Sequence, residues 1–326
     1  MVREPYVTGW TLFHYAADIG SLEITRAIID LYPEPERLHA TREDSNGCTV
    51  LHCAAKSGSV ECVKAILFLY PELERLQAVR SQDKMGETIL HCVARSGSVK
   101  CIKLVLDLYP ESERLKAVEM KDTYGRTVLH HVASNSGNID CINTILNIYP
   151  KSELLSALRM QDRFGMTPVH HVVSESDSIE SIKAILDCFS ESEFTRALRM
   201  KDHSGRTVLH IASVKGPEYM HTILDRCPES ERLQVLDMTD RFGSTVLHCA
   251  AQVGQIDCIN TTLSFYPESE RLRAASTQDA RENTVALCCQ FGQRRVYRSH
   301  SFPRIVPPTD SADTKSVETN FFGSSE

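Results

Sequence analysis

The sequence predicts an all-α solenoid of helix-turn-helix units, each with an extra short helix. Two observations indicate this fold class. A four-residue block that starts with Thr recurs along the 326-residue chain at intervals of 38 to 40 residues, and the apolar residues that follow each block keep helical spacing. A fixed period of this length is typical of repeat architectures, in which a unit buries its apolar face only by stacking on its neighbours.

The Thr-led block opens the first helix of each unit. Thr is preferred at a helix N-cap because its side-chain oxygen can accept a backbone N–H of the first turn. Asp and Gly precede it, as Asp122 and Gly125 precede Thr127, and this combination is typical of a tight turn. The seven blocks that end in His begin at Thr11, Thr49, Thr88, Thr127, Thr167, Thr207 and Thr245, and an eighth block, at Thr284, lacks the His.

Two further helices follow in each unit. A break, usually Gly, ends the first helix, and a second amphipathic run such as residues 60–67 comes after it. A segment of the type Tyr-Pro-Glu-Ser-Glu-Arg-Leu follows, as at residues 109–115. Its Pro suits the first turn of a helix and its acids suit the positive end of the helix dipole. We therefore predict a short third helix, which Tyr109 and Leu115 would dock on the stack.

The unit resembles the ankyrin repeat. That family's pattern is Asp-x-x-Gly-x-Thr-Pro-Leu-His-x-Ala-Ala, then Gly and an amphipathic helix, and the chain is similar to it from about Gly9 to Gly292. Only Pro168 keeps the family's proline, Glu282 replaces the turn glycine of the eighth unit, and each unit is about 5 to 7 residues longer than the usual 33. The resemblance implies a concave, protein-binding face lined by hairpin tips and first helices.

We expect one ankyrin-like repeat domain over residues 1–292, made of seven units and a degenerate C-terminal cap unit, and a disordered tail over residues 293–326 that is basic and then polar. The net charge of −7 argues against nucleic-acid binding, which needs a basic surface. No apolar run approaches the roughly 20 residues of a membrane span, and the N-terminal residues 1–10 lack a signal-peptide core. We therefore expect a cytoplasmic protein.

Recurring histidines are the first candidates for metal or nucleophile chemistry, above all the pairs His130-His131 and His170-His171. A Zn site needs about four converging ligands, whereas the period spreads these groups one per layer. Sequence neighbours on a helix also point about 100° apart, so a pair such as His52-Cys53 does not face a common substrate. We interpret the block histidines as hydrogen-bonding groups at helix starts and predict no catalytic, metal or cofactor residue.

The 12 cysteines lie mostly within apolar stretches, and we interpret them as reduced core residues. Four of them share one position on the second helix, where an apolar residue is expected. Because thiolates form poorly in apolar surroundings, we predict that these four are buried and unreactive: Cys62, Cys101, Cys141 and Cys258.

The hairpin tips are the candidate partner-binding residues. Large side chains stand between the Asp and the Gly of four turns, with arginines beside them, and aromatic residues, Met and Arg are enriched at protein interfaces. The same rings could instead lie flat on the neighbouring hairpin and shield its backbone, and the sequence favours neither alternative. The residues are Met85, Tyr124, Arg126, Arg163, Phe164, Arg206, Arg241 and Phe242.

The tail carries one candidate phosphosite. Residues 298–303, Arg-Ser-His-Ser-Phe-Pro, resemble the Arg-Ser-x-Ser-x-Pro ligand that 14-3-3 proteins bind when its second serine is phosphorylated. A phosphate on Ser301 would add roughly −1.5 to −2 charge, which an Arg cluster on the partner can hold. A match of six residues can also arise by chance, so this partner stays open.

These observations predict a non-catalytic protein-interaction module, an adaptor or scaffold. An enzyme or regulatory subunit with a metal or Cys/His site is the alternative, and stoichiometric zinc in the purified protein would favour it. Ankyrin arrays also serve intracellular bacteria as effectors, which would place the chain in a host cytosol, and these residues do not decide its origin. The partner is a protein whose identity the fold does not specify.

Overall fold

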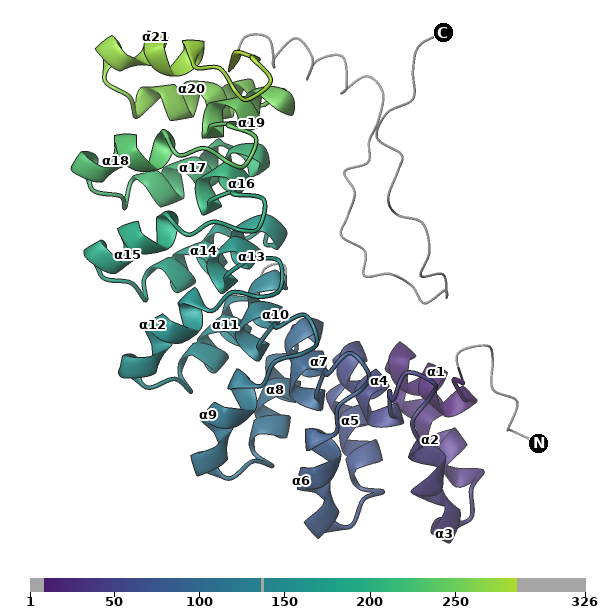
Figure 1. Ribbon diagram of the computed structural model, residues 1–326. Coiled ribbons are helices and arrows are strands. Elements are labelled where there is room, and N and C mark those ends of the chain that lie inside the picture. Colours follow the sequence, from purple (N-terminus) through teal and green to yellow (C-terminus); the bar gives the residue numbers. More distant parts are fainter. Residues whose placement is uncertain (1–8, 136–137, 286–326) are drawn as a thin grey trace, which may run out of the picture.

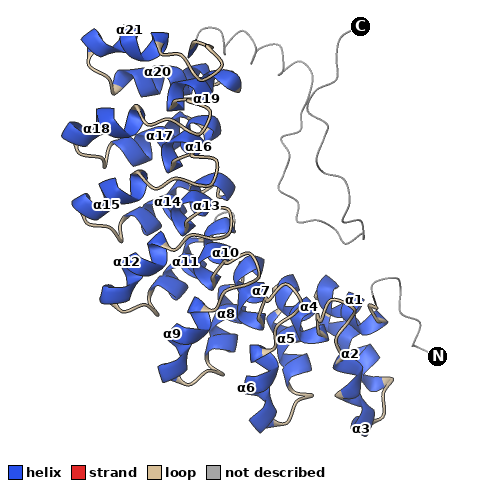
Figure 2. Ribbon diagram, viewed as in Figure 1, coloured by secondary structure: helices blue, strands red, loops and turns tan. Residues whose placement is uncertain are grey.

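The computed structural model describes residues 9–135 and 138–285. Over these residues the chain forms 21 α-helices, one 3₁₀ helix and no strand, as Figure 2 shows. Two isolated β-bridges, Gln82 with Thr88 and Gln278 with Thr284, are the whole of its extended pairing there. The predicted all-α solenoid is confirmed.

Seven three-helix units follow one another in this part of the chain. The first helices are α1 (Leu12–Ile19), α4 (Val50–Ser57), α7 (Ile89–Ser96), α10 (Val128–Ser134), α13 (Pro168–Glu175), α16 (Val208–Lys215) and α19 (Val246–Gln252). The second helices are α2 (Leu22–Asp30), α5 (Val60–Leu67), α8 (Val99–Leu106), α11 (Ile139–Leu146), α14 (Ile179–Leu186), α17 (Pro217–Leu224) and α20 (Ile256–Ser264). The third helices are α3 (Glu34–Arg37), α6 (Glu72–Arg80), α9 (Glu111–Glu119), α12 (Lys151–Arg159), α15 (Glu191–Leu198), α18 (Glu229–Leu236) and α21 (Glu268–Ser276).

The three kinds of helix form three rows. First helices pack on first helices and second helices on second helices along the stack. Figure 1 shows that the stack curves, with the first helices and the hairpin loops on its inner side and the third helices on its outer side. None of the helices at residues 9–135 and 138–285 is long and apolar enough to span a bilayer.

The third helix is present in every described unit, as predicted. Tyr109, which precedes α9, is buried, and its hydroxyl donates a hydrogen bond of 3.2 Å to the Val79 carbonyl of the preceding unit. Leu115 is partly buried and packs against the core. Pro110 lies one residue earlier than predicted: it is the N-cap of α9, with an extended ψ of 142°.

Successive third helices are also joined by ion pairs. Arg80 pairs with Glu113, Arg159 with Glu193, and Arg199 with Glu231, in each case from one unit to the next. Exposed pairs of this kind contribute little stability. The row is therefore held mainly by its buried residues, and the ion pairs fix which neighbours face each other.

The hairpins that carry the tips are linked one to the next by backbone hydrogen bonds. The Arg163 amide donates to the Tyr124 carbonyl at 2.7 Å, and the His203 amide to the Phe164 carbonyl at 2.8 Å. The turn needs a glycine because its residue has positive φ and lies against the next hairpin: a Cβ on Gly205, at φ +77°, would lie 2.6 Å from the Arg241 nitrogen. Close stacking of the hairpins sets the spacing of the tip side chains.

Candidate functional site along the inner face

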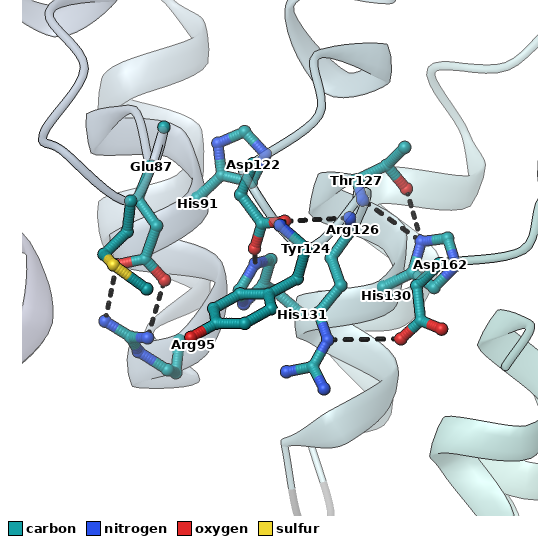
Figure 3. A network of polar contacts seen from close by, with 12 residues as sticks. Glu87, His91, Arg95, Asp122, Tyr124, Arg126, Thr127, His130, His131 and Asp162 are labelled. Atoms are coloured by element: carbon teal, nitrogen blue, oxygen red, sulfur yellow. Dashed lines mark hydrogen bonds and ion pairs between the residues drawn. The ribbon is translucent and has the colours of Figure 1, made fainter. Parts of the chain in front are cut away.

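A histidine cap begins each first helix. In α10 the Thr127 amide donates to His130 Nδ1 at 3.1 Å, and the Thr127 hydroxyl lies 2.9 Å from the same nitrogen (Figure 3). The other ring nitrogen, Nε2, lies 3.1 Å from the Met160 carbonyl at the C-terminal end of α12. An Nδ1 that accepts and an Nε2 that donates require a neutral ring. The interpretation of the block histidines as hydrogen-bonding groups is confirmed.

Burial keeps these rings neutral. Desolvation is the largest cause of a pKa lowered to about 4 for His52 and His91, about 3 for His130 and about 4 for His170. His170 differs from the others in that its buried Nε2 has no hydrogen-bond partner. The caps are therefore structural groups that protonation would break.

Polar residues collect at the two positions that flank the cap. The residue before the N-cap and the fourth residue of the helix usually hold a pair of apolar side chains, the hydrophobic staple. The first unit follows this rule, since the rings of Trp10 and Tyr15 meet edge to face at 4.9 Å. The later pairs are Cys48/Cys53, Glu87/Cys92, Arg126/His131, Met166/His171, Arg206/Ile211 and Ser244/Cys249.

Asp162 is the centre of the most connected of these polar groups. Its side chain is fully buried. Oδ2 accepts from His171 Nε2 at 3.0 Å and from Arg126 Nε at 3.3 Å, and Oδ1 accepts from the Phe164 and Met166 amides at 2.8 and 2.9 Å. Burial alone would raise the pKa of Asp162, but the hydrogen bond and charge of His171 and the two amides outweigh it and hold the pKa at about 2.

The central tip residues are connected to this group through Arg126, which donates to Asp162. The rings of Tyr124 and Phe164 stack with centres 6.0 Å apart, and Arg126 Cζ lies 5.7 Å from the centre of each ring. Phe164 is still 42% exposed. Figure 3 shows Arg126 reaching from beside Tyr124 towards Asp162. We call Tyr124, Arg126 and Phe164 the central tip cluster.

A second cluster lies near the C-terminal end of the described stack. Arg241 Cζ lies 4.7 Å from the centre of the Phe242 ring, and Arg281 Cζ lies 5.5 Å from it. Phe242 is 41% exposed. We call Arg241, Phe242 and Arg281 the C-terminal tip cluster. Arg281 was not predicted from the sequence: it stands two residues after Asp279, the position that Tyr124, Phe164 and Phe242 take in their own turns.

The remaining predicted tip residues do not join either cluster. Met85 is partly exposed at an earlier hairpin, and Arg163 is exposed beside Phe164. Arg206 turns back onto its own hairpin, where its guanidinium lies 2.8 Å from Asp202 Oδ2. The structure thus brings five of the eight predicted residues into two clusters.

The comparison with protein families agrees with this geometry. Residues 2–77 and 68–154 match the family model described as ankyrin repeats (3 copies). The chain contains ankyrin repeats. No curated protein matches it. The same unit of hairpin, histidine cap and helix pair continues through α20, beyond the matched residues. Ankyrin repeats are generally protein-interaction modules, which supports a binding role.

One cluster within the ankyrin repeats has residues that could ligate a metal. Glu87, Asp122 and His131 are buried, and each has a ligand atom within 4.8 Å of the others. The atoms that would bind a metal already have hydrogen-bond partners. Arg95 donates to both Glu87 oxygens at 2.6 and 3.0 Å, and His131 Nε2 lies 3.0 Å from Asp122 Oδ2. Burial would raise the pKa of Asp122, but His131 and the Arg126 amide lower it below its usual value. The donor set fits a charge-compensated network better than an ion site.

The network of Glu87, Asp122 and His131 was not predicted from the sequence, because the histidines and cysteines were considered without the carboxylates of the turns. The partner of His131 is nine residues earlier, in the turn, and the partner of His171 is Asp162 in the same relation. The signal was present, since Asp recurs five residues before every block Thr except Thr11. Nothing in the local pattern indicates, however, that the turn would fold its Asp towards the fourth helical residue.

The four cysteines that share a position on the second helix are fully buried, as predicted. Burial is the largest cause of the raised pKa of Cys101, and it raises the pKa of Cys141 and Cys258 to about 11. Their low reactivity stays a prediction.

Proposed function

We propose that this chain is a non-catalytic, cytoplasmic adaptor or scaffold that binds a protein partner along its inner face, with the two tip clusters as anchors. One observation carries the proposal: two phenylalanines, Phe164 and Phe242, remain about two-fifths exposed on the hairpin tips, each against an arginine. The described residues leave this part of the two rings exposed to solvent. Aromatic and Arg side chains are the residues that most often dominate binding free energies.

The charges at the clusters favour a partner that presents carboxylates beside apolar groups. Arg163, Arg241 and Arg281 are exposed at the tips, although the whole chain carries a net charge of −7. Arg281 and Arg241 both lie over one ring, so an incoming carboxylate could pair with either while an apolar side chain covers Phe242. Complementary charge of this kind mainly sets specificity and the association rate.

The double variant Tyr124→Ala with Phe164→Ala tests the central tip cluster. We expect partner binding to weaken by more than about 1–2 kcal/mol, because central aromatic anchors contribute this much, while stability changes little. Proteins retained by the wild type but lost by the variant would be identified by mass spectrometry, and the affinity of each would then be titrated. A binder that the variant holds as tightly as the wild type does would contradict the assignment.

A matched control comes from the outer row. Leu73 on α6 is 96% exposed, so Leu73→Ala removes a comparable exposed apolar group away from the inner face and should leave binding unchanged. A large fall in the melting temperature of the double variant, with no fall for Leu73→Ala, would mean that the rings serve hairpin packing instead.

The alternative class, an enzyme or regulatory subunit with a metal or Cys/His site, would rest on the cluster of Glu87, Asp122 and His131. Metal analysis of the purified chain separates it from the adaptor: stoichiometric zinc that Glu87→Gln with His131→Gln abolishes would favour the alternative. A role as a bacterial effector in a host cell is compatible with the same binding face and is a question of source, not of chemistry.

The predicted 14-3-3 contact lies outside the described residues. We propose that phosphorylated Ser301 binds a 14-3-3 protein, because the stretch from Arg298 to Pro303 resembles its ligand and a phosphate adds about −1.5 to −2 charge for an Arg cluster to hold. A peptide of residues 293–308 should bind at least about tenfold more tightly with the phosphate than without it, by fluorescence titration. Equal affinities would remove this partner. The boundary at residue 292 between repeats and tail is likewise a proposal.

A further inference from the structure

The second ankyrin repeat holds two sulfurs at the staple positions that flank its cap. Cys48 precedes the N-cap Thr49 and Cys53 is the fourth residue of α4, and their sulfurs lie 3.8 Å apart. The ammonium of Lys56 lies 3.7 Å from the Cys48 sulfur. No other staple pair in the seven units has a cysteine at both positions. The packing that normally joins two apolar side chains here brings two thiols into contact.

We propose that Cys48 and Cys53 are a redox-active pair that a hydroperoxide oxidises to a disulfide. The sulfurs must approach from 3.8 Å to about 2.05 Å, the length of a disulfide bond. The two residues also differ in environment, which gives each a separate role.

Cys48 is the sulfur that reacts first. The hydrogen bond from the Cys53 thiol is the largest cause of a lowered pKa for Cys48, burial opposes it, and the nearby Lys56 lowers it further. The carboxylates of Asp44 and Asp83 act in the opposite direction. Donating this bond and being buried both raise the pKa of Cys53. Cys48 is also the more accessible residue, at 3% exposure against none for Cys53, and it touches the partly exposed Lys56.

The chemistry balances with one hydroperoxide. The Cys48 thiolate attacks one peroxide oxygen, so that an S–O bond forms, the O–O bond breaks and the alkoxide or hydroxide leaves and takes up a proton. Cys53 sulfur then attacks the Cys48 sulfenic acid, an S–S bond forms, and the hydroxide leaves with the Cys53 proton as water. Two thiols and ROOH give one disulfide, ROH and water.

The disulfide would tie the second hairpin to α4 by a covalent bond. It would also remove the thiolate acceptor of Lys56, whose other partners are Asp83 at 3.9 Å and Glu87 at 4.0 Å. Both carboxylates belong to the third repeat. Oxidation would therefore change the charge balance where the second and third repeats meet on the inner face.

The folded full-length chain would be treated with hydrogen peroxide at neutral pH, unfolded in acid, alkylated and digested with trypsin. Cleavage after Arg42 and Lys56 places both cysteines on one peptide, residues 43–56. We expect this peptide to lose two hydrogens and to escape alkylation, and dithiothreitol to restore both thiols. Cys92, at the same helix position but beside Glu87, and Cys62 are the internal controls and should stay alkylated.

Two variants assign the roles. Lys56→Met should slow the oxidation several-fold, because removing the ammonium raises the pKa of Cys48 and lowers the fraction of thiolate. Cys53→Ser should leave Cys48 as a sulfenic acid that a 1,3-diketone probe labels, because the serine hydroxyl can still donate to the Cys48 sulfur but cannot close a disulfide. If Cys48 of this variant takes up no label, the proposal that Cys48 reacts first with the peroxide is overturned. Full alkylation of peptide 43–56 after peroxide, or oxidation of Cys62 and Cys92 at the same rate, would overturn the pair itself.

Discussion

Lowering the pH from 7 to 5 is expected to destabilise the chain by about 2 kcal/mol for each of four buried cap histidines, His52, His91, His130 and His170. Folding lowers the pKa of His52, His91 and His170 to about 4 and that of His130 to about 3, while the unfolded value is about 6.5. Between these values the unfolded chain binds more protons than the folded one. Stability therefore falls as the pH falls through this window.

Urea unfolding at pH 7 and pH 5 would measure the effect, and calorimetry in buffers of different ionisation enthalpy would count the protons taken up on unfolding. Each of these four histidines should account for most of one proton at pH 5. Asp18 and Asp83 oppose the trend, because burial raises the pKa of both. His39→Asn, at an exposed position, is the control. Equal stability at the two pH values would mean that the caps tolerate protonated rings.

Asp162→Ala is expected to cost about 3–5 kcal/mol of stability, the usual result of removing one member of a buried charged group. It would leave His171 Nε2 and the Met166 amide without their acceptor in the interior. Asp162→Asn keeps one oxygen for the amides and should cost less. The free energy of unfolding from denaturant titration would give these values.

Asp240→Ala is the matched control for this change. Asp240 accepts the Phe242 and Ser244 amides at 2.8 and 2.9 Å, as Asp162 accepts its own pair, but the staple position of its unit holds Cys249 instead of a histidine. We expect a loss of only about 1–2 kcal/mol. If the two alanine variants cost the same, then the histidine and arginine contacts of Asp162 add nothing to the turn.

The parts of the fold that the sequence predicted are those whose causes are local. A Thr followed three residues later by His specifies a cap within four residues, and Pro followed by acids specifies a helix start. The first unit shows where local causes end: its motif, residues 32–38, matches the others, yet α3 has a single turn. It contains a second proline, Pro35, and no described unit precedes it for its third helix to pack on.

The candidate site depended on distances between units, which no local pattern contains. That Arg126 approaches both the Tyr124 and the Phe164 ring follows from the backbone bond that joins their hairpins. The sequence left open whether the tip rings bind a partner or pack on the neighbouring hairpin. The rings of Tyr124 and Phe164 do pack on each other, and Phe164 stays partly exposed, so the binding role stays a prediction. The contact of Cys48 with Cys53 was missed for another reason, because all cysteines were interpreted alike.

The histidine caps also make the array directional. Four caps are completed by the carbonyl of the residue before the next block Thr, as His52 is by Glu87 at 3.2 Å and His210 by Ser244 at 3.1 Å. Removing the unit that follows such a cap strips the Nε2 hydrogen bond from its histidine, whereas removing the unit that precedes the cap leaves it whole. Erosion of the stack should run from the C-terminal end towards the N-terminal end, and His248, whose partner is Asn283 at 3.1 Å, marks where it would begin.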